Sequence, residues 1–286
     1  MSTITLSALY TYPIKSARGV SLLESAVGPY GLDLDRHWMV VDSLNRGVTG
    51  RQHPRLLLVE ISLEPDGLAL QAPGMPDLRV PYTPQGVAGR VTLWNIPLEG
   101  VEVSAEVSGW FSSYLGGAFR LFKFSDHSNR RMNPLFGDAP IAFPDGNPLH
   151  LISESSLIDL NSRLTLPITA QRFRPNIVVY GSEPYLEDNW KQVRIGTLEC
   201  AVVEATARCG MVNFTHGQVM PEPLRTLARY RRNGRQILFG QNLVHAQQGV
   251  LRVGEELSVL EVGEDNCHWA AADSKKGFTQ GELTNG

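Results

Sequence analysis

The sequence predicts a mainly β (α+β) protein with two β-rich halves. Short runs of alternating apolar and polar residues recur along the chain, turn-forming residues break them at short intervals, and few segments have helical spacing. A chain of 286 residues is long enough to bury a core without disulfide support. We therefore expect an N-terminal β-barrel-like domain over 1–124, a second β-barrel domain over 125–263, and a flexible tail or truncated linker over 264–286.

Residues 1–104 have the pattern of a small sheet or barrel. The strands predicted there are Thr3–Tyr12, His37–Asp42, Leu56–Leu63, Leu68–Gln71, Val91–Leu93 and Glu99–Val103. A helix is predicted over 105–116, where Gly116 and Gly117 end the pattern. Its apolar residues recur at helical spacing: Val107, Trp110, Phe111, Tyr114 and Leu115.

The second half is also predicted to be mainly β. A helix over 154–164, for which Ser153 is the candidate cap, separates the two strand-rich regions, and another helical stretch covers Pro223–Arg232. The polar segment 125–150 is the candidate inter-domain connection or lid. The strands predicted here are Arg174–Val179, Gln192–Ile195, Leu198–Glu204, Gln241–Val244, Val250–Val253 and Leu257–Val262.

Composition and charge exclude several classes of protein. The 26 Lys and Arg residues nearly balance the 29 Asp and Glu residues, so the net charge of −3 draws the chain neither to nucleic acid nor to anionic lipid, and any anion site must be a local pocket. No apolar run approaches the roughly 18 residues of a membrane span, and the N-terminus lacks the features of a signal peptide. We expect a cytoplasmic protein that binds neither nucleic acid nor membranes.

Several motifs with a known chemical mechanism are absent from the sequence. GxGxxG after a strand, GxxxxGK[ST] and GxSxG do not occur, which argues against a Rossmann dinucleotide site, a P-loop and an α/β-hydrolase. The seven histidines contain no HxH or HExxH, which argues against a histidine-bound zinc or iron centre.

The three cysteines are too few for a disulfide framework. Cys209 is the most suggestive, because Arg208 next to it favours the thiolate form and Gly210 permits a close approach of a ligand. A buried structural cysteine is an equally good interpretation of this context. Cys200 lies in an apolar run and is expected in the core, and Cys267, followed by a histidine, is left unassigned.

Three basic segments are candidates for an anion cradle: Pro13–Ser16, Asp35–Trp38 and Arg172–Asn176. Each also has a structural explanation, namely a snorkelling lysine, a surface Asp–Arg pair or an arginine at a strand edge. Only convergence of the three segments in space would favour a binding site.

Eight segments together resemble, in the same order, the signature blocks of proteins with a MOSC N-terminal β-barrel followed by a MOSC domain, especially the mitochondrial amidoxime-reducing component and its bacterial counterparts. The resemblance covers about residues 4–262. The segments are Tyr12–Gly19 (YPIKSARG), Asp35–Asp42 (DRHWMVVD), Thr49–Leu56 (TGRQHPRL), Ile152–Arg163 (ISESSLIDLNSR), Phe173–Val179 (FRPNIVV), Ala207–Cys209 (ARC), Glu222–Tyr230 (EPLRTLARY) and Phe239–Gln241 (FGQ).

The resemblance implies a molybdenum cofactor (molybdenum bound by molybdopterin) in the cleft between two β-barrel domains. Cys209 stands at the position of the metal ligand, and Asp145 is a candidate catalytic group near the metal. The positions that correspond to pterin and phosphate contacts, or support them, are Lys15, Ser16, Arg36, Asp145, Gly146, Asn147, Arg174, Asn176, Ala207, Cys209 and Asn242.

The sequence departs from the family pattern at some of these positions. The loop after Asp145 carries hydroxyl residues in the mitochondrial relatives, whereas Gly146 and Asn147 follow it here, so backbone N–H groups and the Asn147 amide would have to bind the phosphate. Ala207 replaces a serine and Asn242 an aromatic residue. The chain lacks the Cys-rich block of a [2Fe–2S] domain, so no iron–sulfur cluster is expected, and electrons would come from a separate ferredoxin-like, flavin or cytochrome b5-like protein.

The leading hypothesis is therefore a molybdenum-dependent oxidoreductase that reduces small N-hydroxylated compounds (hydroxylamines, amidoximes, N-hydroxylated bases) to amines. One alternative is a sulfur-carrier or molybdenum-cofactor-handling protein that uses a persulfide on Cys209, because MOSC domains also occur beside molybdenum-cofactor sulfurases. Another alternative is a binding protein that retains both barrels without turnover.

Overall fold

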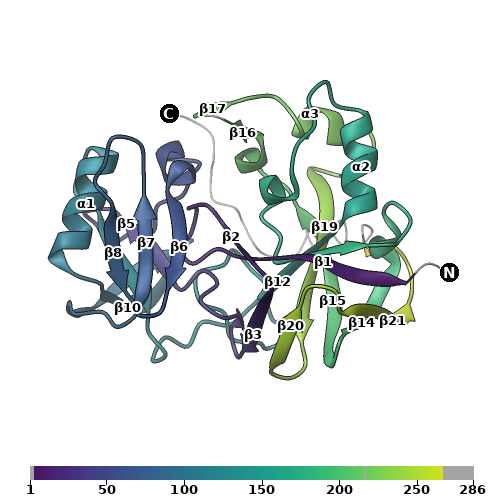
Figure 1. Ribbon diagram of the computed structural model, residues 1–286, viewed down its shortest axis with the longest axis horizontal. Helices are drawn as coiled ribbons and strands as arrows, with labels where there is room; N and C mark the ends of the chain where they lie inside the picture. Colours follow the sequence, from purple (N-terminus) through teal and green to yellow (C-terminus); the bar gives the residue numbers. More distant parts are fainter. Residues whose placement is uncertain (1–2, 216, 267–286) are drawn as a thin grey trace.

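The computed structural model describes residues 3–215 and 217–266. Two strand-rich lobes lie side by side, one built mainly from residues 38–124 and one that contains a β-barrel (Figure 1). Three α-helices occur in the described part of the chain, and the mainly β fold class is confirmed. No helix in these residues is long and apolar enough to cross a membrane.

Seven of the described strands close into the barrel, since β19 pairs with β12 through Leu149–Leu243 and Leu151–Gln241. β12 and β13 are parallel, and the other neighbours in the ring are antiparallel. Apolar side chains such as Leu6, Leu9 and Val193 fill the barrel core. The order around the ring is β12 (Leu149–Ser153), β13 (Ile177–Tyr180), β1 (Ile4–Thr11), β21 (Glu256–Val262), β14 (Trp190–Ile195), β15 (Leu198–Ala207) and β19 (Gln236–His245).

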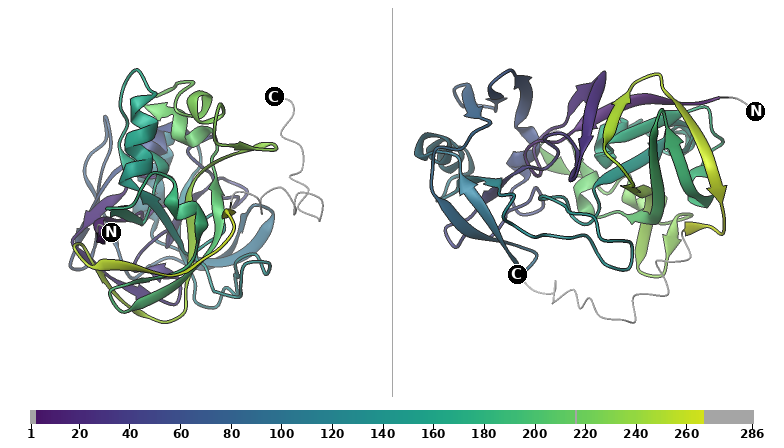
Figure 2. Two further views of the ribbon diagram at one scale, coloured as in Figure 1. Left: turned by 90° about the vertical axis from the view of Figure 1, so that its right-hand side faces the viewer. Right: turned by 90° about the horizontal axis from the view of Figure 1, so that it is seen from below.

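The N-terminal segment belongs to both lobes. β1 is a barrel strand, β2 (Val20–Leu22) pairs with β1, and β3 (Glu24–Gly28) pairs with β20 (Gly249–Arg252) and with β4 (Gly31–Leu32). The chain then enters the first lobe at β5 (Trp38–Val41). Seen from below in Figure 2, right, this segment, in purple, reaches from the barrel toward the blue lobe. Residues 12–36 therefore lie where the two lobes meet.

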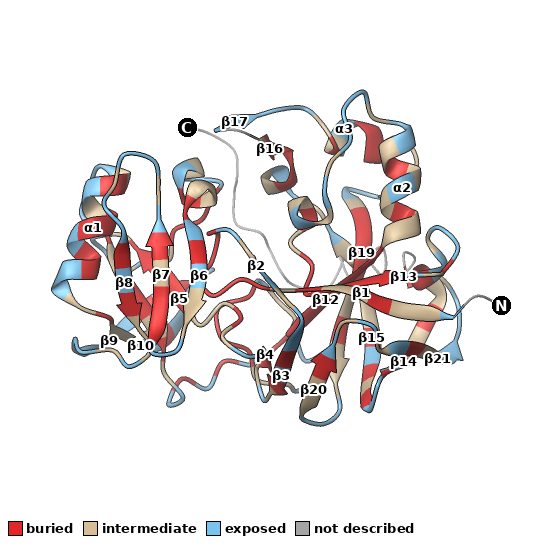
Figure 3. Ribbon diagram, viewed as in Figure 1, coloured by how far each residue is buried: buried red, intermediate tan, exposed pale blue. Residues whose placement is uncertain are grey.

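The first lobe contains two small sheets and a helix. One core joins the two sheets to helix α1 (Ala105–Leu115) and contains Trp38, Leu68 and Phe111. Figure 3 colours the buried residues of this lobe red. Ser104 caps α1 by accepting a hydrogen bond from the Val107 N–H, which agrees with the predicted helix. The sheets are β5, β11 (Arg120–Phe124), β10 (Ile96–Glu102) and β9 (Ala88–Leu93), and β6 (Glu60–Glu64), β7 (Gly67–Gln71) and β8 (Leu78–Pro81).

Three of the expected elements are partly wrong. The strand expected over Arg174–Val179 begins only at Ile177, because Arg174 has a left-handed backbone conformation at the end of the 3₁₀ turn Ala170–Phe173. Pro54–Leu58, which overlaps the predicted strand Leu56–Leu63, forms a 3₁₀ turn with the proline at its first position, so β6 begins only at Glu60. The helix expected over Pro223–Arg232 is the short α3 (Leu224–Leu227), because β18 (Arg232–Asn233) pairs with β19 to form a hairpin.

Helix α2 (Glu154–Ser162) begins where it was predicted, although Ser153 does not cap it through its side chain. The Ser153 hydroxyl instead bonds to the Ser182 hydroxyl at 2.9 Å. The remaining short elements are β16 (Phe214–Thr215), β17 (Gln218–Val219) and the 3₁₀ turns Ala170–Phe173, Leu186–Asn189 and Gly210–Asn213. Of the predicted tail, Asn266 is buried and donates a hydrogen bond to the Trp190 carbonyl, and 267–286 lie outside the described residues.

Glu187 is fully buried beside α2. Its Oε1 accepts a hydrogen bond of 2.6 Å from the Ser156 hydroxyl, and its Oε2 has no hydrogen-bond partner among the described residues. Burial raises the pKa of this carboxyl from 4.5 to about 7. The folded protein therefore holds a proton at Glu187 over a pH range in which the unfolded chain releases it.

We expect the free energy of unfolding to fall as pH rises from about 4.5 to 7, because the native state binds more protons than the unfolded chain there. Glu187→Gln removes this titration. It should stabilise the protein by on the order of 2 kcal/mol near pH 8 and much less near pH 4.5, in urea titrations at both pH values. Glu183→Gln, at an exposed carboxyl nearby, is the control, and an equal effect of Glu187→Gln at both pH values would contradict the prediction.

Candidate functional site

A cavity of about 330 Å³ lies where the N-terminal segment, the first lobe and the barrel meet. Its wall includes Arg51 and Trp94 from the first lobe and, from the barrel, the C-terminal part of β15 and Asn242 of β19. All the positions that the resemblance assigned to the cofactor line this cavity, namely Lys15, Ser16, Arg36, Asp145, Gly146, Asn147, Arg174, Asn176, Ala207, Cys209 and Asn242. The three basic segments thus converge in space, as a binding site would require.

Cys209 follows the end of β15 and precedes the 3₁₀ turn Gly210–Asn213. Its side chain is exposed and lines the cavity, so the interpretation of Cys209 as a buried structural cysteine is wrong. Cys200 is buried as predicted, and burial raises the pKa of its thiol to about 12. Cys267 lies outside the described residues.

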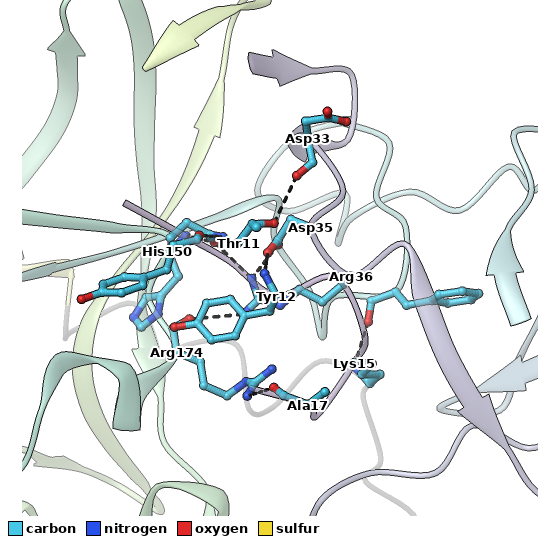
Figure 4. Close-up of polar contacts among 12 residues, drawn as sticks. Thr11, Tyr12, Lys15, Ala17, Asp33, Asp35, Arg36, His150 and Arg174 are labelled. Atoms are coloured by element: carbon cyan, nitrogen blue, oxygen red, sulfur yellow. Dashed lines mark hydrogen bonds and ion pairs between the residues drawn. The ribbon is translucent and has the colours of Figure 1, made fainter. Parts of the chain in front are cut away.

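Tyr12 organises two arginines at the lobe junction (Figure 4). The guanidinium carbons of Arg36 and Arg174 each lie 4.3 Å from the centroid of its buried ring. Arg174 donates a hydrogen bond of 2.7 Å to the Ala17 carbonyl, and Arg36 donates one of 3.2 Å to the Arg174 carbonyl. Burial, and after it the charge of Arg36, lowers the pKa of Arg174 to about 10. An anion bound here would oppose this decrease, because its charge stabilises the protonated guanidinium.

Three of the candidate residues have left-handed backbone conformations, which are uncommon outside glycine. The φ angles are +70° at Ser16, +52° at Arg36 and +55° at Arg174. Such conformations are unfavourable and cluster at functional sites, where the surrounding structure enforces them. The three positions lie on separate segments, so the fold imposes this backbone geometry independently in each.

Asp145 is paired with Lys15 in the cavity wall. The Lys15 ammonium donates hydrogen bonds to Asp145 Oδ1 at 2.6 Å and to the Phe143 carbonyl at 2.8 Å, and the Trp94 indole N–H lies 3.3 Å from the same Oδ1. Desolvation would raise the pKa of Asp145, but the charge and hydrogen bond of Lys15, with Arg51 and Arg36, hold it well below its usual value. Asp145 is therefore ionised at neutral pH.

The Asn147 amide is already engaged within the protein. Its Nδ2 donates a hydrogen bond of 2.9 Å to Glu204 Oε1, and its Oδ1 is buried without a hydrogen-bond partner among the described residues. Since one amide hydrogen is committed to Glu204, a phosphate at this loop would depend more on backbone N–H groups than expected.

Residue types alone had not pointed to several other lining residues. The sequence indicates Arg208 only as a neighbour of Cys209. In the structure, Arg208 also donates a hydrogen bond of 2.6 Å to the Phe173 carbonyl and lies 3.3 Å from His150 Nε2. Burial lowers the pKa of Arg208 to about 10 and the pKa of His150 well below 6.5. His150 is thus neutral, and its Nε2 can accept a hydrogen bond from the Arg208 guanidinium. Glu204 lies on β15, five positions before Cys209 in the sequence, and no motif marks it as a site residue.

The cavity is locally cationic although the whole chain has a net charge of −3. Its described lining residues include two carboxylates, Asp145 and Glu204, and six cationic side chains: Lys15, Arg36, Arg51, Arg172, Arg174 and Arg208. No cluster of three or more His, Cys, Asp or Glu side chains that could hold a metal occurs in residues 3–215 and 217–266. The arrangement suits an anion, or a metal that arrives with its own anionic ligand and takes one thiolate from the protein.

The closed barrel, the appended strand-rich lobe and the thiol-lined cavity between them define the class of protein. The chain matches the family model of the MOSC N-terminal beta barrel domain over residues 3–118 and that of the MOSC domain over residues 138–258. It therefore belongs to the family of MOSC-domain proteins with a MOSC N-terminal barrel, which confirms the resemblance.

Within this family the chain is similar to mitochondrial amidoxime-reducing components. It is 36% identical over 276 residues to component 2 of Rattus norvegicus, with 88% of this chain and 82% of the relative covered. It is 36% identical over 279 residues to component 1 of Mus musculus, with 90% and 82% covered. It is 34% identical over 279 residues to component 1 of Homo sapiens, with 90% and 83% covered.

Proposed function

We propose that this protein is a molybdenum-cofactor-dependent oxidoreductase that reduces N-hydroxylated compounds to amines. The observation that carries the proposal is the convergence of an exposed thiol and six cationic side chains in one cavity between the lobes. The printed names of the relatives, amidoxime-reducing components, support the reductive chemistry.

The residues present fit a phosphorylated molybdenum pterin. Cys209 would supply the single protein thiolate, while Arg36, Arg174 and Lys15, with Ser16 and the backbone of Asp145–Asn147, would bind the phosphate and the pterin through charge-assisted hydrogen bonds. Asn176 supports this set, because its Oδ1 lies 3.4 Å from Arg36 Nη1 and its Nδ2 donates to the Tyr10 carbonyl. Ala207 would contact the ligand from the end of β15, and Asn242 would do so from within β19.

The proposed reaction converts a hydroxylamine or amidoxime, two electrons and two protons into an amine or amidine and water. When bound, the molybdenum group supplies the two electrons, and a separate ferredoxin-like, flavin or cytochrome b5-like protein replenishes them. The protein would position the substrate beside Cys209. The ion pair with Asp145 would hold the Lys15 side chain in place in the wall of the cavity.

Metal analysis and a reductase assay on the same sample test this proposal. Freshly purified protein should contain about one molybdenum per chain by mass spectrometry. With a chemically reduced viologen as electron donor, it should convert an aryl amidoxime to the amidine. A sample with no molybdenum and no reduction of amidoximes or hydroxylamines would refute the proposal.

We also propose that the protein acts in the cytoplasm, although the relatives are named as mitochondrial. The 26 Lys and Arg residues nearly balance the 29 Asp and Glu residues, so no general attraction to an anionic membrane surface opposes this location. Fractionation of the source cells tests it, and recovery of the protein in an organelle or membrane fraction would contradict it.

A further inference from the structure

Glu204 is the second carboxyl group of the described cavity wall, and the described groups that bind it are neutral. It is half-buried on β15, and its Oε1 accepts hydrogen bonds from Asn147 Nδ2 and Asn242 Nδ2, both at 2.9 Å. Asn242 is oriented in turn by the Thr206 hydroxyl, which donates to its Oδ1 at 3.0 Å. No described residue forms a hydrogen bond or ion pair with Glu204 Oε2, so one oxygen is held and the other is available.

The two carboxyl groups of the cavity have opposite electrostatic environments. Desolvation raises the pKa of Glu204, and the two amide hydrogen bonds offset only part of this effect. Lys15 and the nearby arginines hold the pKa of Asp145 well below its usual value. When the environments of two acids separate their pKa values in this way, the acid with the raised pKa is suited to donate protons and the other stays ionised.

The remaining titratable groups of the described cavity wall are poor proton donors. A guanidinium group does not give up its proton in proteins, and the Lys15 ammonium is committed to Asp145 and to the Phe143 carbonyl. His150 is neutral, and its Nε2 faces the Arg208 guanidinium. Cys209 is the proposed metal ligand. Glu204 is the acid that remains.

We propose that Glu204 is the proton donor of the reductive reaction, an inference that rests on the proposed function. The N–O bond of the substrate breaks as two electrons enter, which come ultimately from the electron-donor protein. The proton held at Glu204 Oε2 passes to the departing hydroxyl oxygen, which leaves as water, and a second proton from solvent completes the amine. Glu204 then takes a proton back from solvent.

Glu204→Gln tests this role, because the glutamine carbonyl can still accept both amide hydrogen bonds but the side chain carries no transferable proton. We expect an unchanged molybdenum content and a reductase rate lower by about 10²–10⁴-fold. The wild-type rate should fall as pH rises through the pKa of Glu204, and this decrease should be absent in the variant. Glu199→Gln makes the same change on the same strand outside the cavity and should keep the wild-type rate and pH profile.

A measurement independent of turnover is the titration of the Glu204 carboxyl by carbon-detected NMR on cofactor-free protein, with the resonance assigned from its loss in Glu204→Gln. We expect a midpoint above the ordinary value of 4.5. A midpoint at or below that value, or a variant with the wild-type rate and pH profile, would overturn the role of Glu204 and leave the proposed function standing. A wild-type protein that binds molybdenum but reduces no N-hydroxylated compound would overturn both.

Discussion

Cys209→Ala should abolish both molybdenum retention and reductase activity while leaving the fold intact. The side chain is exposed at the cavity, so its removal creates no buried void, and the free energy of unfolding should change by less than about 0.5 kcal/mol. No cluster of other metal-ligating side chains occurs among the described residues to replace the lost thiolate. Elemental analysis of the purified variant, with circular dichroism as the check on folding, measures both effects.

Cys200→Ala is the matched control, because it removes a thiol from β15, the strand that leads to Cys209. This thiol is buried in the barrel core, so its loss should cost about 1 kcal/mol of stability and leave the molybdenum content unchanged. The opposite pattern, with metal retained in Cys209→Ala and lost in Cys200→Ala, would be incompatible with the proposed site.

The sulfur-carrier alternative makes a different prediction for the same thiol. A persulfide on Cys209 would increase the intact mass of the isolated protein by one sulfur atom, and Cys209→Ala would remove that increase. A sample with bound pterin and an unmodified Cys209 would instead favour the reductase. The exposure of the thiol is compatible with both chemistries, whereas the cationic wall of the cavity favours the phosphorylated ligand.

Local sequence patterns predicted many elements of this fold but not their partners. Alternation identified β1 and β21 as strands, yet alternation cannot reveal that β1 closes the barrel of the second lobe by pairing with β13 and β21. The predicted helix over 223–232 forms only at Leu224–Leu227, and Arg232, at the end of that segment, pairs with β19 in the β18–β19 hairpin. Tertiary pairing prevailed over local pattern there.

Residue types alone made Cys209 and the three basic segments candidates for the site, and the resemblance to known proteins supplied the other predicted positions. The thiol, the lysine and the two arginines that contact Tyr12 lie in recognisable blocks, whereas Glu204 has no motif around it. Its contacts depend on the register between β15 and β19, which places Asn242 opposite it, and on the loop that brings Asn147 to the same oxygen. Those contacts join segments far apart in the chain, so residue spacing alone could not predict them.

Tyr12→Leu should destabilise the protein by about 3 kcal/mol and reduce its cofactor content. The substitution keeps an apolar side chain but removes the ring that contacts both Arg36 and Arg174. Two like charges would then lie at the junction without the aromatic group that attracts both of them. Gly19 packs closely on the ring, since a Cβ at Gly19 would clash with Tyr12 Cε1, and leucine would leave that space unfilled. Urea titration and elemental analysis measure the two losses.

Tyr12→Phe separates the contribution of the ring from that of the hydroxyl group. The buried Tyr12 Oη has no hydrogen-bond partner among the described residues, so its removal leaves no group unpaired and should change stability by less than about 1 kcal/mol. The ring, and with it the positions of both guanidinium groups, is retained. If Tyr12→Leu were as stable and as rich in cofactor as Tyr12→Phe, the aromatic contact would not position the arginines. The positions of the arginines would then depend on the ion pair of Arg36 with the buried Asp35 and on the hydrogen bond of Arg174 to the Ala17 carbonyl.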